Sequence, residues 1–396
     1  MMLKGKDIVL ISNQMMDDRY WTSKQYITME LIKNNRVLYV EANYSFGKLF
    51  SGLLGKKWPV SPFGRMQIKN ENLTILTPFP RLPYRNHFGW IGRVNQKLLL
   101  YKIRKAANIL NFNTPILWTF LHQTADLIGK LDEEVSVYHC VDDWPILLPM
   151  AGMGVPSVIQ KDEQKLISSM DIIIGVSPKL LNYADLSEKK VAEIPNGVDI
   201  TLFDMDRYSD KTLPFDMKNL PRPIIGFSGS IGEWIDIDLI LKTAKHFSDA
   251  SVVIIGLNEK NPDIYRLKLM DNVHFLGMKS RKDVPKYISG FDVCLMPFKH
   301  SEIGEGLIPL KMFEYLAMGK PVVSISSDAL KPFKDVLFLA ENEIEFITSV
   351  EKANSDWNPK KSAFARERAL EYSWENRVKK YSSEINKRIS KTKDGK

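Results

Sequence analysis

Short apolar runs alternate with helix-like segments along the first half of the chain. Residues 7–12 form an apolar run, residues 23–34 show helical spacing, and residues 37–42 are apolar again. Strand, helix and strand in this order make the repeating unit of a parallel sheet. The pattern continues through further apolar runs at residues 73–76, 115–120, 135–140 and 171–176. The first half is therefore predicted to form one doubly wound α/β domain.

A second series of the same kind begins at Ile224. It contains a helix-like segment at residues 237–247 and apolar runs at residues 224–229, 251–256, 273–277, 293–298 and 321–326. Prolines, charged residues and the pair Asn196-Gly197 separate the two series, a composition typical of a linker. We place the domain boundary near residue 215.

The predicted fold class is α/β, with two Rossmann-like domains facing across a cleft. They are an N-terminal domain over residues 1–214, expected on the acceptor side, and a C-terminal domain over residues 215–375, followed by a helix over residues 376–396 that packs back on the N-terminal domain. A length of 396 residues fits this division, because single cores stop growing beyond roughly 250–300 residues. Open sheets bind ligands beyond the carboxyl ends of their strands, so such a cleft suits a reaction that joins two substrates.

Cysteine content and the N-terminus indicate where the protein works. Cys140 and Cys294 each lie in an apolar run and lack metal-ligand spacing, so both are expected to be reduced core residues. The chain begins with Met-Met-Leu-Lys-Gly-Lys directly before a strand, and no window reaches the roughly 18 apolar residues of a membrane span. We expect a cytoplasmic protein that is neither secreted nor membrane-spanning.

The positive charge is concentrated near the N-terminus. Residues 1–110 contain 18 Lys and Arg against 6 Asp and Glu, whereas the whole chain has a net charge of +8. Nucleic acid is not expected as a partner, because no base-reading motif is present. An anionic membrane on the cytoplasmic side, or a lipid-phosphate acceptor, fits better. Residues 46–65 and 87–105 interleave cations with Phe, Leu and Trp as interfacial segments do, although an ordinary amphipathic helix explains the second equally well.

Residues 301–324 carry the most informative motif. Pro309 suits a first helical turn, and Gly319 followed by Pro321 ends the helix. The free N–H groups at the helix start and the Lys311 ammonium together favour a diphosphate. Glu314 lies about one turn further on, where a carboxylate can accept both hydroxyls of a ribose.

The sequence PLKMFEYLAMGKPVVS resembles the donor-binding segment of GT-B glycosyltransferases, in particular bacterial enzymes similar to the teichuronic acid biosynthesis glycosyltransferases. Supporting motifs are PNGVD at 195–199, GFSGSIGEW at 226–234, NVHFLGM at 272–278 and FDVCLMPF at 291–298. The resemblance implies that Lys311 binds phosphate, Glu314 binds ribose and Met278 lies near the base. It also implies that Ser228, Gly229 and Ser230 lie near the diphosphate, beside the N–H groups expected to be free around Leu307 and Ile308.

Two departures leave the stereochemistry open. Retaining members of the family carry a Glu eight positions before the ribose-binding Glu, where this chain has Gly306, with Glu302 and Glu305 nearby. They also carry a basic residue where this chain has Gly232-Glu233-Trp234. An inverting transfer needs a base that takes the proton of the acceptor hydroxyl.

Candidates for that base follow the strand predicted at residues 135–140. Asp142 and Asp143 come just past its end, and related sequences place an acid after a Tyr-containing strand, which favours Asp142. One of the pair could instead cap the next helix. His139 in the strand, His122 after residues 115–120, and Arg19 and Trp21 in the first loop are candidates for contact with the acceptor or the donor sugar. For His122 a structural role is the alternative.

The expected function is the transfer of a hexosyl or uronosyl group from a nucleotide-sugar to a glycan or lipid-linked acceptor during cell-wall or cell-surface polysaccharide synthesis. The expected donor is a UDP-sugar. No cofactor or metal is expected, because no Asp-x-Asp set is present to hold a cation. A nicotinamide dehydrogenase is disfavoured, since the loop after residues 7–12 lacks a Gly-x-Gly-x-x-Gly turn. A sugar-nucleotide epimerase and a non-catalytic nucleotide-sugar-binding partner of a membrane synthase remain as alternatives.

Overall fold

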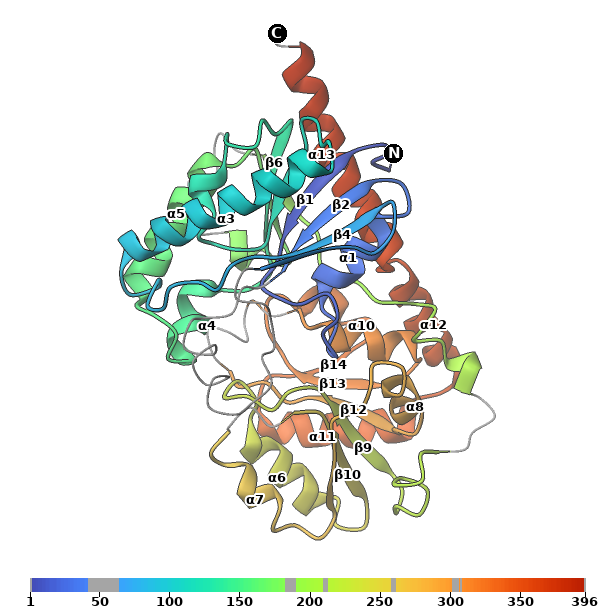
Figure 1. The fold of residues 1–396 in the computed structure, drawn as a ribbon. Coiled ribbons are helices and arrows are strands. Elements are labelled where there is room, and N and C mark those ends of the chain that lie inside the picture. Colours follow the sequence, from blue (N-terminus) through green and yellow to red (C-terminus); the bar gives the residue numbers. More distant parts are fainter. Residues whose placement is uncertain are drawn as a thin grey trace. The chain divides into compact units, whose positions relative to one another are not determined.

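The computed structural model describes residues 2–41, 64–181, 190–208, 213–257, 261–300, 306 and 308–394 (Figure 1). The chain divides into two compact units, one made of Met1–Pro195 with Arg377–Lys396 and one of Asn196–Asn376. Each unit contains its own twisted sheet, so the prediction of two α/β domains is confirmed. The segment 46–65, predicted to be interfacial, lies almost entirely outside the described residues.

The first unit contains a sheet with the strand order β3-β4-β2-β1-β5-β6-β7-β8. All its strands run parallel except β3, which pairs antiparallel with β4. The strands are β1 (Asp7–Ile11), β2 (Arg36–Val40), β3 (Arg65–Ile68), β4 (Leu73–Thr77), β5 (Ile116–Thr119), β6 (Val135–Cys140), β7 (Ile172–Gly175) and β8 (Lys190–Glu193). The inner strands are buried and largely apolar because helices cover both faces of the sheet.

Helices of the first unit cover the two faces of this sheet. They are α1 (Ser23–Leu31), α3 (Gly89–Ile109), α4 (Trp144–Met150), α5 (Pro156–Ser169) and most of α13 (Trp374–Asp394), with short 3-10 turns at Ala125–Leu127 and Lys179–Leu181. Figure 1 shows α3 and α5 on one face, and α1 and α13 on the other. Val378, Tyr381 and Ile385 of α13 are fully buried at helical spacing. The C-terminal segment thus completes the core of the first unit.

The second unit contains a parallel sheet with the strand order β11-β10-β9-β12-β13-β14. Its strands are β9 (Ile224–Ser228), β10 (Ser251–Ile255), β11 (Val273–Gly277), β12 (Val293–Met296), β13 (Val322–Ile325) and β14 (Phe338–Ala340). Its helices are α6 (Ile237–His246), α7 (Ile264–Leu267), α8 (Val284–Ser289), α10 (Leu310–Ala317), α11 (Glu343–Asp356) and α12 (Pro359–Leu370), with 3-10 turns at Met205–Tyr208 and Lys331–Phe333.

The unit boundary lies at Pro195, about twenty residues before the predicted position. The proline-containing segment does not behave as a separate linker, because Val198, Phe203 and Met217 are buried in the core of the second unit. The backbone of Val198 also pairs with that of Ser373. Apolar side chains, more than prolines, therefore set the boundary.

No helix in the described part of the chain is long and apolar enough to cross a bilayer. Cys140 and Cys294 are both buried and form no disulfide with each other.

Candidate functional site

Helix α10 begins within one residue of the predicted start and ends at the predicted glycine. Pro309 occupies the N-cap position, one residue before the first helical turn. At the other end Gly319 has a φ of +64°, and the N–H groups of Gly319 and Lys320 donate to the carbonyls of Leu316 and Tyr315. This is a Schellman motif, which requires a residue that tolerates the left-handed conformation.

The Lys311 side chain packs against the glycine turn that follows β9. A Cβ atom added to Gly229, whose φ is +141°, would lie 2.5 Å from the Lys311 Nζ atom. The same ammonium lies 4.1 Å from the centre of the Phe227 ring. Burial lowers the pKa of Lys311 to about 7. The site therefore holds a poorly solvated cation at the carboxyl end of β9, close to the start of α10.

Hydrogen bonds fix the backbone around this cation. The Ser228 N–H donates to the Tyr315 hydroxyl over 2.7 Å, which ties the end of β9 to α10. The Asn196 amide donates to the Ile308 carbonyl over 2.9 Å, which ties the PNGVD motif to the segment before α10. Ser230 follows in the same turn and is partly buried. A cation and free helix N–H groups held in this way form a site suited to a diphosphate.

Glu314 lies on the same helix as Lys311. Burial raises the pKa of Glu314 to about 7, although the positive charges of Lys311 and Arg281 oppose the rise. Arg281 forms an ion pair of 2.5 Å with Asp199, the last residue of PNGVD. Arg281 is not among the site residues expected from the sequence. Its position shortly after the NVHFLGM motif was the signal that could have revealed it.

The remaining donor-side candidates lie in different surroundings. Met278 follows β11 with 39% of its surface exposed, so it does not serve core packing. Ile308 is buried and its side chain belongs to the core of the second unit. Leu307, Glu302 and Glu305 lie outside the described residues.

Two candidate bases follow β6 in the first unit. Asp142 is one-third exposed, and its Oδ2 atom lies 3.9 Å from the Nζ atom of Lys24, a buried residue of α1. Asp143 is buried at the N-cap position of α4, but its side chain makes no capping hydrogen bond there. Asp142 is thus the better placed of the two to meet a substrate from solvent.

His139 is not available to a sugar. It is completely buried, with its ring stacked on Phe120 at 4.8 Å and packed edge-on against Tyr381 of α13 at 5.0 Å. Burial lowers its pKa to about 3. Side chains alternate along a strand, so Tyr138 and Cys140 face α5 and His139 faces α13. The prediction that His139 contacts the acceptor or the donor sugar was therefore wrong.

His122 lines a pocket of about 590 Å³ in the first unit. The imidazole is 2% exposed, and burial together with the charge of Arg85 lowers its pKa to about 3. With the Gln123 amide oriented to satisfy both neighbours, the amide donates to His122 Nε2 over 3.1 Å and accepts from Arg85 over 2.8 Å. His122 is thus a neutral residue that helps to orient Gln123 and Arg85.

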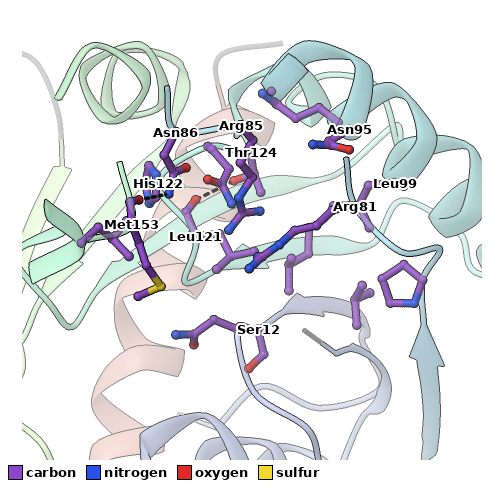
Figure 2. Close-up of a pocket in the computed structure, with 18 of the residues that line it drawn as sticks. Ser12, Arg81, Arg85, Asn86, Asn95, Leu99, Leu121, His122, Thr124 and Met153 are labelled. Carbon is purple, nitrogen blue, oxygen red and sulfur yellow. Dashed lines mark hydrogen bonds between the residues drawn. The ribbon is translucent and has the colours of Figure 1, made fainter. Parts of the chain in front are cut away.

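The pocket lies at the carboxyl ends of β1, β2, β4 and β5 (Figure 2). Its walls include Ser12, Glu41, Leu121, Arg81 and Arg85. Sequence analysis did not single out either arginine, although both follow a predicted strand in the stretch PRLPYRN. Loops at this end of a parallel sheet are the usual place for ligands.

Arg19 and Trp21 do not line this pocket. Arg19 is exposed, and the Trp21 ring packs edge-on against Tyr26 at 5.3 Å. Trp21 precedes the N-cap Thr22, so its contact with Tyr26 forms a hydrophobic staple beside the Thr22 and Gln25 capping box. The first loop reaches the pocket through other residues, namely Asn13, Gln14, Met15 and Asp18.

In the described residues, no three His, Cys, Asp or Glu side chains gather in an arrangement that could hold a metal ion.

Comparisons with known proteins find sequence similarity in the second unit. Residues 222–355 match the family model described as "Glycosyl transferases group 1". Over 233 residues the chain is 29% identical to "Putative teichuronic acid biosynthesis glycosyltransferase TuaH" of Bacillus subtilis (strain 168). That match covers 54% of this chain and 57% of the relative, so it spans little more than half of either protein.

Similar solved structures extend over nearly the whole chain. A sucrose-phosphate synthase from Thermosynechococcus elongatus matches with a TM-score of 0.72 and 15% identity, covering 97% of this chain and 99% of that one. Anabaena Alr3699/HepE in complex with UDP and glucose matches with a TM-score of 0.61 and 15% identity, covering 96% and 99%. At these identities the likeness establishes the fold, which is the two-domain GT-B architecture.

Proposed function

We propose that this chain, which contains a group 1 glycosyltransferase domain at residues 222–355 within a GT-B fold, transfers a sugar from a nucleotide-sugar to a glycan or lipid-linked acceptor. The observation that carries the proposal is the arrangement of Lys311 beneath Gly229, with Glu314 one turn along the same helix. Lys311 and the start of α10 bind the diphosphate, and Glu314 binds the ribose.

The donor is a UDP-sugar, and a hexosyl or uronosyl group is transferred. The UDP and glucose in the complex of HepE support this choice of donor. The similarity to TuaH supports a role in cell-wall or cell-surface polysaccharide synthesis. No cofactor or metal takes part, because Lys311 and the helix N-terminus balance the charge that develops on the departing diphosphate.

Asp142 acts as the general base. Its carboxylate takes the proton of the acceptor hydroxyl while that oxygen forms a bond to the anomeric carbon and the bond to the diphosphate breaks. The Lys24 ammonium, 3.9 Å from Asp142, holds the carboxylate in position. A single displacement of this kind inverts the anomeric centre.

Transfer from UDP-sugars to lipid extracts tests the proposal. Asp142→Asn is expected to lower the turnover about 100-fold or more, the usual contribution of a positioned base, while UDP affinity is unchanged. Asp143→Asn is the matched comparison and is expected to affect turnover less. Conversion of a UDP-sugar without an acceptor would indicate an epimerase instead, and UDP binding without any transfer would indicate a non-catalytic binding partner.

Helix α3 contacts an anionic membrane on the cytoplasmic side. The helix contains five Lys and Arg residues and no acidic residue. Its apolar residues Trp90, Val94 and Tyr101 are exposed, with 60% of Trp90 and 59% of Tyr101 accessible. Exposed aromatic side chains flanked by cations are typical of helices that lie in the membrane interface.

Sedimentation with vesicles tests this contact. The protein is expected to bind phosphatidylglycerol vesicles more tightly than phosphatidylcholine vesicles, and the double variant Trp90→Ser/Tyr101→Ser to lose most of that binding. Tyr265→Ser is the matched control, because Tyr265 is 61% exposed in the second unit. Equal binding to both vesicles, or full binding by the double variant, would exclude this role for α3.

A further inference from the structure

The pocket of the first unit contains two cations that form no ion pair among the described residues, although the acids Asp18 and Glu41 also line it. Arg81 and Arg85 both line it, and neither forms an ion pair with any carboxylate in the part of the chain that the structure describes. Glu41, which also lines the pocket, is already engaged, since its oxygens accept from the Met16 N–H over 2.7 Å and from the Thr77 hydroxyl over 2.8 Å. The two guanidinium charges are therefore not neutralised by this acid.

Both guanidinium groups are partly shielded from solvent. Arg81 and Arg85 are each half-buried, and burial lowers the pKa of both side chains. Repulsion from the charge of Arg81 lowers the pKa of Arg85 further, while the carboxylate of Asp162 opposes this effect. Because arginine keeps its proton in proteins, this repulsion is relieved most effectively by an anion bound between the two groups.

The backbone that carries the arginines is anchored on both sides. Asn95 of α3 donates to the Leu82 carbonyl over 3.1 Å and accepts from the Leu82 N–H over 2.8 Å. Asn86 donates to the Met153 carbonyl over 2.8 Å, and its own carbonyl accepts from the Val155 N–H over 3.0 Å. The segment is thus preorganised before any ligand binds, which reduces the cost of binding.

Side-chain contacts orient Arg85 in the same way. Gln123 accepts from its guanidinium, and His122 holds Gln123 in turn. Figure 2 shows Arg81 and Arg85 extending into the pocket that Ser12, Leu121 and Met153 border. Arginine forms paired, parallel hydrogen bonds with planar carboxylates and with phosphates, so these two anions fit the site best.

We propose that Arg81 and Arg85 bind the anionic group of the acceptor, a phosphate or a carboxylate, which restricts the enzyme to acidic acceptors. The assignment of the ligand as an acceptor rests on the proposed function. The pocket, about 590 Å³ in volume, has room for a sugar residue beside the anion. The anion has two obvious sources, namely the diphosphate of a lipid-linked acceptor and the carboxylate of a uronic acid.

Binding measurements with charged and neutral probe pairs test the inference and separate the two sources. Farnesyl diphosphate is compared with farnesol, and methyl glucuronide with methyl glucoside. UDP is kept at saturating concentration so that anionic probes cannot occupy the donor site. At least one anionic probe is expected to bind at least tenfold more tightly than its neutral counterpart, and that probe identifies the phosphate or the carboxylate.

Variants locate the binding site. Arg85→Gln and Arg81→Gln are each expected to weaken the binding of the anionic probe about tenfold or more. Arg85→Lys keeps the positive charge but loses the paired N–H donors of the guanidinium, so it is expected to weaken binding less than Arg85→Gln. It replaces Arg85→Gln in the test if that variant does not fold. Arg65→Gln is the matched control, since Arg65 is exposed in the same unit and does not line the pocket.

Equal binding of charged and neutral probes, or full binding by Arg81→Gln and Arg85→Gln, would overturn the assignment. A separate titration with UDP distinguishes this failure from failure of the proposed function. If UDP does not bind, while an anionic probe added without UDP binds and depends on the two arginines, the glycosyltransferase proposal falls and the anion site stands.

Discussion

Binding of UDP at pH 8 is expected to take up about 0.4 to 0.9 protons through Lys311. Burial lowers the pKa of Lys311 to about 7, so at pH 8 only about one molecule in ten carries the charged ammonium. A diphosphate beside the ammonium raises the pKa again, by about 1 to 3 units for opposite charges in contact. Between about half and nearly all of the bound molecules then carry the charged ammonium, which gives the uptake of about 0.4 to 0.9 protons.

The sign of the pH dependence follows from this uptake. Because a proton is bound together with UDP, the affinity falls as the pH rises above 7, by a factor of about 3 to 8 per pH unit near pH 8. Glu314 contributes little there. Its pKa is raised to about 7, so at pH 8 about nine molecules in ten are already ionised before UDP binds.

Titration calorimetry at pH 8 in two buffers of different ionisation enthalpy measures the number of protons directly. Lys311→Met is expected to abolish the difference between the buffers as well as weakening binding. Lys286→Met is the matched control, since Lys286 is exposed on the same unit. A wild-type enthalpy that does not depend on the buffer, or a dependence that persists in Lys311→Met, would refute the argument.

Two further predictions concern stability. Gly229→Ala is expected to lower the free energy of unfolding by about 1 to 3 kcal/mol and to weaken UDP binding, because the φ of Gly229 is +141° and the new Cβ would lie 2.5 Å from Lys311 Nζ. Urea denaturation and UDP titration measure these two effects. Gly129→Ala is the control: Gly129 has a φ of +68° and open space around it, so this substitution is expected to affect stability alone. Burial raises the pKa of Glu163 from 4.5 to about 7. The protonated carboxyl therefore stabilises the fold fully below pH 4.5, and this stabilisation, at most about 3 kcal/mol, is lost as the pH rises through 7. Glu163→Gln should therefore exceed the wild type in stability at pH 8 but not at pH 5, and equal pH dependence of the two proteins would contradict the prediction.

Much of the fold could be predicted from the apolar runs. Strands such as Ile224–Ser228 and Ser251–Ile255 are short, apolar and separated by helical segments, which is the pattern of a parallel sheet. Helix α10 could also be predicted, because Pro309 and Gly319 mark its two ends by backbone chemistry alone. Local signals of this kind do not depend on the rest of the molecule.

The surroundings of His139 and the position of the unit boundary, which the sequence pattern did not predict, depend on distant parts of the chain. His139 lies in a strand that is apolar on both faces, so its sequence does not reveal which face receives the helix carrying Tyr381, more than 200 residues away. The unit boundary was misplaced because Val198 and Phe203 are single apolar residues in a polar stretch, and only the structure shows them in the core of the second unit.

The arginine pair was missed for a different reason. Arg81 and Arg85 lie in an irregular segment between β4 and α3, which has no periodicity to interpret. Their role depends on the absence of an ion pair to either arginine among the described residues, and that can only be seen once the loops after β1, β2 and β5 are brought together. A search for charged residues after every predicted strand would have found both.

Titration of the protein and of Glu314→Ala with UDP, GDP and NAD tests the central claim, which is that the second unit binds a nucleotide-sugar donor. Saturable binding of one nucleoside diphosphate, UDP, is expected, and Glu314→Ala is expected to weaken it by about 1.5 to 3 kcal/mol, the scale of hydrogen bonds to a charged group. Binding of NAD alone, or UDP binding that the substitution leaves unchanged, would contradict it.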